Sequence, residues 1–449
     1  MSTVAWIHEV QWTDIPEAVR RQTWRCLLDT LGTAIGGRQT DLSGIIHNFA
    51  ASAYGGQGAR LWLDGQEVSP PGAALANGMT IDSLDMHDGY APVKGHAGAA
   101  LVPALFATLS LHRGVVSGQD LLTALTVGYE IALRAGLALH ATACDYHTSG
   151  AWNALGCAAI TARHLSSTGA QTRHALGIAE YHGPRSQMMR CIDYPTMLKD
   201  GSGWGAMAGV SAGLMAHAGF TGAPALTVEG SEVAHFWADL GQKWLILDQY
   251  FKPHAVCRWA QPAMTGALAL YQTHKLSPES IRRIRVFAFH EATRLACRQP
   301  QTTEEAQYSL PFPVAATLVH GQLGPAQLSG EALTDPVVLA LAGRVELIEE
   351  EAYNARFPAL RLSRVEIETT DGQYFDSGEV QANWDNTLPP TDEELREKFR
   401  WLAQSSLTES RLTELEELIW HCTELSDVSA LMKLLALSSE KNQSVYTKE

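Results

Sequence analysis

The sequence lacks the features of secreted, cluster-binding and nucleic-acid-binding proteins. Its seven cysteines are scattered over 449 residues and form no close pair at metal-ligand spacing, so we expect no iron–sulfur cluster and a reduced, cytoplasmic compartment. The first residues contain no basic stretch followed by an apolar one, which predicts no signal peptide. Lysine and arginine number 33 against 48 acidic residues, giving a net charge of −15 without a basic stripe. A nucleic-acid partner is therefore not expected.

Apolar runs of the kind that span a membrane are also absent. The longest apolar run, Gly203 to Phe220, is rich in glycine and alanine and contains His217, which predicts a close-packed core helix rather than a membrane span. We therefore expect no membrane partner. Hydrophobic residues make up 46% of the chain and charged residues 18%, which is enough apolar material for a large core in one large domain or a few modest ones.

The familiar cofactor and nucleophile motifs are missing too. The chain has no Gly-x-Ser-x-Gly elbow, no phosphate loop and no dinucleotide fingerprint after a strand, which argues against a serine hydrolase and a nucleotide cofactor. No histidine pair is spaced four residues apart on an expected helix. A metal site at Asp85, His87 and Asp88 is the weaker alternative, because carboxylates and imidazoles do bind divalent ions. We predict that the protein uses no metal and no cofactor.

The hydrophobic pattern predicts a mainly α protein with an α+β portion. Residues 1–268 contain one helical pattern after another, and small residues at helical spacing let the helix backbones approach closely. Alanine- and glycine-rich helices are expected near residues 97–112, 119–140, 150–166 and 202–219. This part is predicted to be a compact helical domain.

The pattern changes in residues 269–390. Apolar and polar residues alternate in residues 283–289 and 363–376, and Asp371-Gly372 provides a hairpin turn. Helical runs at 312–322 and 332–343 complete a smaller α+β domain. Residues 391–449 return to helix, near 393–404, 408–422 and 426–438. We expect these helices to rejoin the first part, giving a large all-helical domain built from both chain ends plus a smaller inserted α+β domain.

One segment is unusually dense in chemically active side chains. Residues 85–98 contain Asp85, Asp88, Lys94, His96 and a further histidine, interrupted by glycines and a proline and followed by an apolar helical run. Loops of this kind on a helical scaffold often carry catalytic groups. The alternative is a solvated loop between two helices.

Three further segments combine cations with helix starts. His147 precedes a Thr-Ser pair, and Lys199-Asp200 precedes a glycine-rich helix start of the type that binds anions. The third segment contains Lys252, His254 and Arg258 beside aromatic residues. Each segment alone is equally consistent with a helix cap or the polar rim of a helix.

Taken together and in this order, the segments resemble the MmgE/PrpD family over nearly the whole chain. Individually the matching motifs are short, but as an ordered series they are specific. They are Leu28-Asp29-Thr30-Leu31-Gly32, Ala76-Asn77-Gly78-Met79, Leu84-Asp85-Met86-His87-Asp88, Gly95-His96, His147-Thr148-Ser149, Met197-Leu198-Lys199-Asp200-Gly201, Phe251-Lys252-Pro253-His254, Cys257-Arg258-Trp259 and Tyr308-Ser309-Leu310-Pro311-Phe312-Pro313-Val314-Ala315-Ala316.

The resemblance implies a helical domain from both chain ends, a smaller α+β domain, a homodimer and a cofactor-free site where the two domains meet. The family includes 2-methylcitrate dehydratase, cis-aconitate decarboxylase and iminodisuccinate epimerase. By motif position, the resemblance implies five functional residues, which are Asp85, His96, His147, Lys199 and His254. The chain departs from the decarboxylase branch, which carries a tyrosine at Phe312 and a lysine at Gln249, and the usual Gly-His-Pro is Gly-His-Ala here.

These reactions all occur beside the carboxylates of small polycarboxylic acids. Each needs an acid or a base at the carbon next to a carboxylate, and cations that hold the carboxylates. Histidine can act as either at neutral pH, and lysine or arginine can clamp a carboxylate. The residues expected to bind substrate are Asp88, Lys94, Lys252 and Arg258.

We therefore predict a lyase that removes water from a small hydroxy-polycarboxylate such as 2-methylcitrate. Three alternatives remain open from the sequence: an epimerase or isomerase on the same type of substrate, a decarboxylase of a related polycarboxylate, and a non-catalytic protein that binds acidic metabolites.

Overall fold

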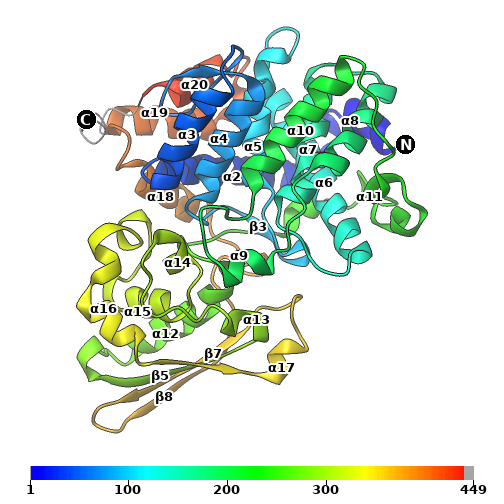
Figure 1. The fold of residues 1–449 in the computed structure, drawn as a ribbon. Coiled ribbons are helices and arrows are strands. Elements are labelled where there is room, and N and C mark those ends of the chain that lie inside the picture. Colours follow the sequence, from blue (N-terminus) through cyan, green and yellow to red (C-terminus); the bar gives the residue numbers. More distant parts are fainter. Residues whose placement is uncertain (1, 439–449) are drawn as a thin grey trace.

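The computed structural model describes residues 2–438, which form a larger helical part and a smaller part that contains a sheet (Figure 1). Most of the helical part comes from the first half of the chain. Its helices there are α1 (Thr3–Glu9), α2 (Glu17–Gly37), α3 (Asp41–Ala53), α4 (Pro70–Asp82), α5 (Gly98–Thr108), α6 (Gly118–Thr142), α7 (Gly150–His164), α8 (Gly169–His182), α10 (Ser202–His217) and α11 (Leu226–Glu229). The short α9 (Met189–Asp193) lies between α8 and α10 in the chain.

Small residues bring these helices into close contact. α10 packs against α4 and α7, and a Cβ atom at Gly203 would lie 2.4 Å from the carbonyl oxygen of Leu75. No side chain larger than hydrogen fits at that distance, so glycine is required where α10 crosses α4. The expectation that glycine and alanine allow close backbone approach is confirmed at this crossing.

α6 is the one helix in residues 2–438 that is long and apolar enough to cross a membrane. Its apolar window is 94% buried, and α6 packs against α7, α5 and α2. Core helices of this kind are apolar because they are surrounded by protein. Residues 203–220, the longest apolar run in the sequence, form most of α10, and a smaller share of α10 than of α6 is buried.

The smaller part is built on a four-stranded sheet with strand order β6-β5-β7-β8. The strands are β5 (Ile281–Ala288), β6 (Val345–Glu349), β7 (Ser363–Thr369) and β8 (Tyr374–Val380). β5 pairs in parallel with β6, while β5–β7 and β7–β8 are antiparallel. The predicted strands and the hairpin at Gly372, with φ of +87°, are confirmed. The sequence analysis missed β6, a five-residue edge strand.

Helices cover one face of this sheet. α12 packs against β7 and β8, and α15 packs against α12 and α16 (Figure 1). The helices of this part are α12 (Gln261–Thr273), α13 (His290–Thr293), α14 (Thr303–Gln307), α15 (Pro311–His320), α16 (Pro336–Ala342) and α17 (Glu351–Asn354). Two small ribbons lie outside the main sheet: β1 (Ala59–Arg60) with β2 (Glu67–Val68), and β3 (Gly89–Tyr90) with β4 (Gln249–Tyr250).

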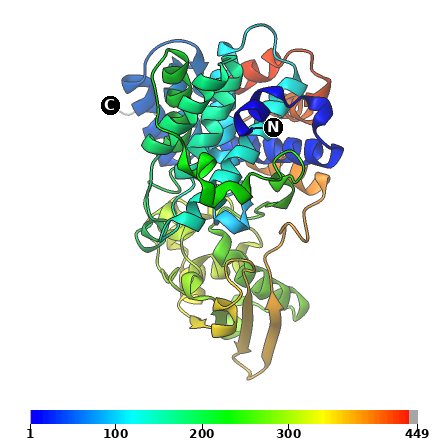
Figure 2. The same ribbon diagram turned by 90° about the vertical axis from the view of Figure 1, so that its right-hand side faces the viewer.

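After β8 the chain runs back to the helical part (Figure 2). The returning helices are α18 (Asp392–Ala403), α19 (Glu409–Trp420) and α20 (Ser429–Ala436). α18 packs against α2, where the buried Lys398 Nζ lies 2.6 Å from Asp29 Oδ1. The apolar side chains of α18, α19 and α20 join the same core as α2, α5 and α6. Residues 439–449 of the expected C-terminal segment lie outside the described residues.

Candidate active site

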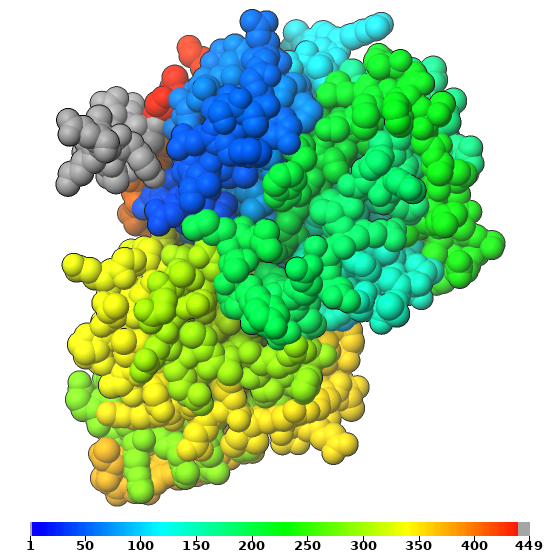
Figure 3. Space-filling view, viewed as in Figure 1, coloured from blue at the N-terminus to red at the C-terminus, as the bar shows by residue number. Residues whose placement is uncertain are grey.

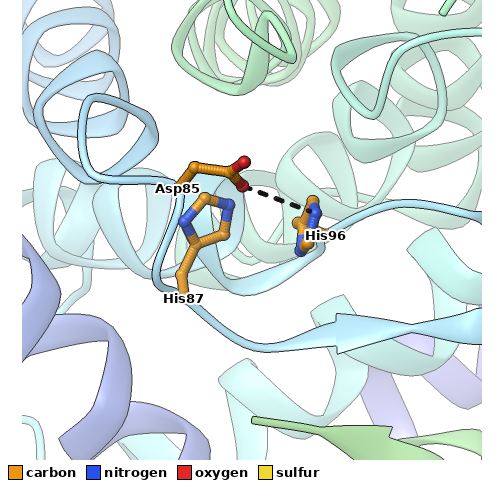
Figure 4. Close-up of side chains that lie close together, drawn as sticks. All are labelled: Asp85, His87 and His96. Carbon is orange, nitrogen blue, oxygen red and sulfur yellow. Dashed lines mark ion pairs between the residues drawn. The ribbon is translucent and has the colours of Figure 1, made fainter. Parts of the chain in front are cut away.

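The segment between α4 and α5 forms the centre of the candidate site. It leaves α4 through Asp85, whose φ is +49°, pairs with β4 at Gly89 and Tyr90, and returns through a 3-10 turn to the start of α5. A Cβ atom at Gly89 would lie 2.5 Å from the hydroxyl of Tyr250 and 2.8 Å from His96 Nδ1. Glycine at this position therefore lets the backbone pass between the two rings. The bends bring Asp85, His87 and His96 together (Figure 4).

His96 is held in one tautomer. Its Nδ1 lies 2.6 Å from the backbone carbonyl of Asp88. A carbonyl can only accept, so Nδ1 carries the hydrogen and Nε2 of the neutral ring keeps its lone pair. Burial, and then the positive charge of Lys252, lower the pKa of His96 to about 3. His96 is thus a neutral imidazole at pH 7, with an unprotonated Nε2 3.9 Å from Asp85 Oδ1.

Asp85 is an ionised, buried carboxylate. The Lys252 ammonium lies 2.5 Å from Asp85 Oδ1 and donates to the Asp85 carbonyl oxygen at 2.8 Å. Burial acts against ionisation, but Lys252 and then Lys199 outweigh it and lower the pKa of Asp85. Lys252, expected to contact substrate, therefore lies against Asp85 and fixes its orientation.

Lys199 is a second buried lysine near this pair. It precedes α10 in a left-handed conformation, with φ of +50°. Its ammonium donates to the side-chain oxygen of Gln307 and lies 4.8 Å from the ring centre of Tyr308. The Gln307 amide nitrogen donates to the carbonyl of Ser83 at 2.9 Å, which turns its oxygen toward Lys199. Within residues 2–438, Lys199 forms no ion pair with a carboxylate.

The three side chains in Figure 4 also have the composition of a metal site. One ligand atom from each lies within 4.8 Å of the others, and the ring nitrogens of the buried His87 form no hydrogen bond among the described residues, although Nε2 lies 3.5 Å from Asp82 Oδ1. However, burial, His96 and three lysines (Lys252, Lys398 and Lys199) all lower the pKa of His87. Lys252 and Lys398 are paired with Asp85 and Asp29, so of these three lysines in the described part of the chain Lys199 is left to oppose a bound cation and attract an anion. The arrangement therefore suits a carboxylate better than a metal ion.

His147 lies on a neighbouring loop, less buried than His96. Its Nε2 is 3.9 Å from Asp145 Oδ1, and burial lowers its pKa. Two residues later, the Ser149 hydroxyl accepts a hydrogen bond of 2.8 Å from the His96 backbone and is itself bonded to the carboxylate of Asp200. The loop is therefore connected to His96 through Ser149, whereas the described residues show no direct contact between His147 and Asp85 or His96.

Lys94 and His254 occupy the borders of the site. Lys94 has φ of +54°, and its ammonium lies 4.7 Å from the ring centre of Tyr146. His254 accepts a hydrogen bond of 3.3 Å from the Leu323 backbone at Nδ1. Burial, followed by the charge of Lys398, lowers the pKa of His254 to about 4, so this ring is also neutral at pH 7.

Two residues expected to bind substrate have structural partners instead. Asp88 accepts hydrogen bonds from the Tyr129 hydroxyl at 2.7 Å and the Gly98 backbone at 3.3 Å, at the start of α5. Arg258 pairs with Asp385 at 2.7 Å and donates to the carbonyl oxygens of Phe251 and Asn383. Charge and a place in the motifs put both in the predicted site; the structure shows their contacts with the protein, and contact with substrate stays a prediction.

Sequence analysis missed several residues that shape the site. Some belong to the motifs already noted, and others come from distant parts of the chain. They are Ser149, Asp200, Tyr250, Gln307, Tyr308, Arg361 and Lys398. Lys398 on α18 donates to the Met86 carbonyl at 2.6 Å and so connects the segment between α4 and α5 to the C-terminal helices. A lysine within an ordinary amphipathic helix gives no sequence signal of this role.

A cleft of about 300 Å³ leads to the surface beside Lys199. Thr148, Cys191 and Gly201 also line it. The segment that carries α9 covers the junction between the helical part and the smaller part (green at the centre of Figure 3). The volume is suitable for a small organic acid.

Comparison with known proteins identifies the family. The family model described as MmgE/PrpD N-terminal domain matches residues 2–238, and the model described as MmgE/PrpD C-terminal domain matches residues 254–422. The chain is 25% identical to the cis-aconitate decarboxylase-like protein oryM of Aspergillus oryzae, with 96% of each chain covered. It is 25% identical to a cis-aconitate decarboxylase of Aspergillus terreus, covering 96% of this chain and 94% of the relative. It is 27% identical to the cis-aconitate decarboxylase of Homo sapiens, covering 96% and 92%. The two matches together span most of the chain, which therefore belongs to the MmgE/PrpD family.

Proposed function

We propose that this chain is a cofactor-independent hydro-lyase that dehydrates a small hydroxy-polycarboxylate such as 2-methylcitrate. The observation that carries the proposal is the unprotonated Nε2 of neutral His96 beside Asp85, with the buried Lys252 and Lys199 acting on that carboxylate. Removing water from such a substrate requires a base for a carbon-bound proton and positive charge for the electrons that the carbon acquires.

In the proposed reaction, His96 Nε2 takes the proton from the carbon next to a carboxylate. The developing negative charge spreads onto that carboxylate, where buried ammonium groups stabilise it. The electron pair then forms the carbon–carbon double bond as the carbon–oxygen bond breaks. The hydroxide leaves as water after receiving a proton from an acid, for which Lys199 and the neighbouring Tyr308 hydroxyl are candidates.

Lys199 also suits a carboxylate clamp. It is buried, carries a positive charge and borders the cleft to the surface. A substrate carboxylate can replace or share its present neutral partner, Gln307, and gains a charge-assisted hydrogen bond by doing so.

Decarboxylation of a related polycarboxylate is the second candidate, because the three relatives above bear the name cis-aconitate decarboxylase or a name like it. The resemblance places a tyrosine of the decarboxylase branch at Phe312, which is fully buried and offers no hydroxyl group. This difference supports dehydration. Epimerisation needs the same base with a second acid on the opposite face of the carbon, for which His147 is the candidate.

Proton NMR in heavy water, with a panel of hydroxy di- and tricarboxylates and with cis-aconitate, distinguishes these reactions. We expect an alkene signal to appear from a hydroxy acid and deuterium to enter the carbon next to a carboxylate. Exchange without net product would indicate epimerisation, and loss of carbon dioxide from cis-aconitate would indicate decarboxylation. No exchange and no product across the panel would overturn the proposal of an enzyme and leave a binding protein.

We place this activity in the cytoplasm in the proposal, because all seven cysteines are free thiols in the structure, as expected of a reducing compartment. Neither a nucleic acid nor a membrane is part of the proposed function, and the partner is a small polycarboxylate.

A further inference from the structure

Arg361 is a buried cation that has no role in the reaction proposed above. It lies between α17 and β7, in the smaller part, and is 6% exposed. One guanidinium nitrogen, NH2, donates to the carbonyl of Ala91 at 3.2 Å. The other two, Nε and NH1, are buried and have no hydrogen-bond partner among residues 2–438. Arg361 thus reaches from the smaller part to the segment that carries Asp85 and His96.

Arg258, which lies over the same aromatic ring, is a second buried arginine whose donors do have partners. Both guanidinium groups lie over Tyr250, at 4.5 Å for Arg258 and 5.4 Å for Arg361. Arg258 is neutralised by Asp385, whereas Arg361 forms no ion pair with any carboxylate in the described part of the chain. A buried charge without a counter-ion costs several kcal/mol, so its presence indicates that an anion completes it.

Arg361 and Lys199 lie near different members of the reactive pair. The ring centre of Tyr250 is 6.2 Å from that of His96, and the Arg361 guanidinium lies over the same ring, 5.4 Å from its centre. The positive charge of Arg361 acts on His96, and that of Lys199 acts on Asp85. Two buried cations without carboxylate partners therefore border the base and its neighbouring carboxylate.

We infer that Arg361 binds one carboxylate of the substrate while Lys199 binds another, so that the substrate carries at least two carboxylates and lies across Asp85 and His96. The inference rests on the proposed function in taking the substrate to be a carboxylic acid. The planar guanidinium keeps N–H donors without partners among residues 2–438 on two edges, at Nε and at NH1, and a carboxylate can bind one of them together with the second hydrogen of NH2. Arg361 is thereby assigned as the residue that selects dicarboxylates over monocarboxylates.

The test compares two ligands that differ in one carboxylate. Maleate has two, and isocrotonate has a methyl group in place of the second. We expect isothermal titration of the full chain to show tighter binding of maleate. Arg361→Met should weaken maleate binding about 10- to 100-fold, the loss expected for hydrogen bonds to a charged group, and leave isocrotonate binding nearly unchanged. Lys199→Met should weaken the binding of both ligands.

A thermal readout separates this role from a structural one. Removing a buried charge without a counter-ion should leave the ligand-free Tm equal or higher, while the Tm increase caused by maleate shrinks. Arg356→Ala is the matched control, because Arg356 lies in the same segment, pairs with Glu379 at the surface and should behave as the wild type. If Arg361→Met fails to fold, Arg361→Lys is tested instead. Lysine keeps the positive charge but lacks the planar guanidinium, and we expect this variant to bind maleate about 10-fold more weakly than the wild type.

The two proposals fail in different ways. If the wild type binds neither maleate nor cis-aconitate, the proposed function itself is overturned. If the wild type binds maleate and the Arg361 variants bind it equally well, only the role of Arg361 is overturned.

Discussion

Nε2 of His96 and Oδ1 of Asp85 lie 3.9 Å apart, and each residue is fixed by bonds from outside the pair. The opposite ring nitrogen of His96 is held by the Asp88 carbonyl, and Asp85 is held by the ammonium of Lys252. Both side chains are thereby held in one orientation, which is the preorganisation that the proposed acid–base catalysis requires.

Replacing the base should abolish most of the activity. We expect His96→Ala to lower kcat by about 10²- to 10⁴-fold, because the carbon-bound proton then has no positioned acceptor. Steady-state kinetics on the substrate found by NMR measures this change. The control is His235→Ala, since His235 is exposed on the helical part. An unchanged kcat in the His96 variant would remove His96 from the mechanism.

We expect the effects on stability of replacing Lys252 and of replacing Asp85 to be strongly coupled, because the two side chains form an ion pair. Lys252→Met leaves Asp85 as a buried carboxylate without its closest cation, and we expect the free energy of unfolding to fall by about 3–5 kcal/mol. Adding Asp85→Asn removes that charge and should restore much of the stability without restoring activity. Denaturant unfolding of the two single variants and the double variant measures the coupling. Additive effects would contradict the pairing.

Much of this arrangement could be predicted from the sequence, because the informative residues are clustered. The ionisable segment at residues 85–98 and the Lys199 helix start each follow local rules of turns and helix ends, and the structure places Lys199 near Asp85. The strand alternation in β5 and β7 was equally local. β6 has only five residues and pairs in parallel with β5 across a long connection, so nothing nearby in the sequence marks it.

The direction in which a charged side chain points could not be predicted from the sequence. Asp88 lies in the same motif as Asp85 but faces Tyr129, 41 residues further along the chain. Arg361 comes from a segment with no motif, and only the fold brings it to Ala91. Which charge faces the substrate and which faces the scaffold depends on long-range packing, and residue type alone cannot distinguish the two.

The oligomeric state stays a prediction. The resemblance implies a homodimer, and α3 exposes two large apolar side chains one turn apart, Ile45 at 59% and Phe49 at 43%. Neighbouring apolar groups on a surface often mark an interface. We expect light scattering at micromolar concentration to give twice the chain mass of 48.7 kDa. Ile45→Arg with Phe49→Arg should lower that mass, whereas Val115→Arg, in an exposed loop, should not. A monomer mass for the wild type would contradict the prediction.

The last prediction concerns the pH dependence that Asp88 gives to stability. Burial, with the negative charge of Asp29 adding to it, raises the pKa of Asp88 to about 7 from an ordinary value of 3.8. Between these values the folded protein keeps a proton that the unfolded chain releases. The contribution of Asp88 to stability is therefore fully present below pH 3.8 and is lost as the pH rises through 7.

Asp88→Asn has no such proton and should not show this loss. The free energy of unfolding of the variant, relative to the wild type, should therefore increase by several kcal/mol between acidic pH and pH 8. Urea unfolding at pH 5 and pH 8 measures the difference. Glu331→Gln, at an exposed carboxylate, is the matched control. A difference between Asp88→Asn and wild type that stays constant with pH would show that Asp88 is ionised in the folded protein throughout this range, and its position beneath α5 would then require a counter-ion.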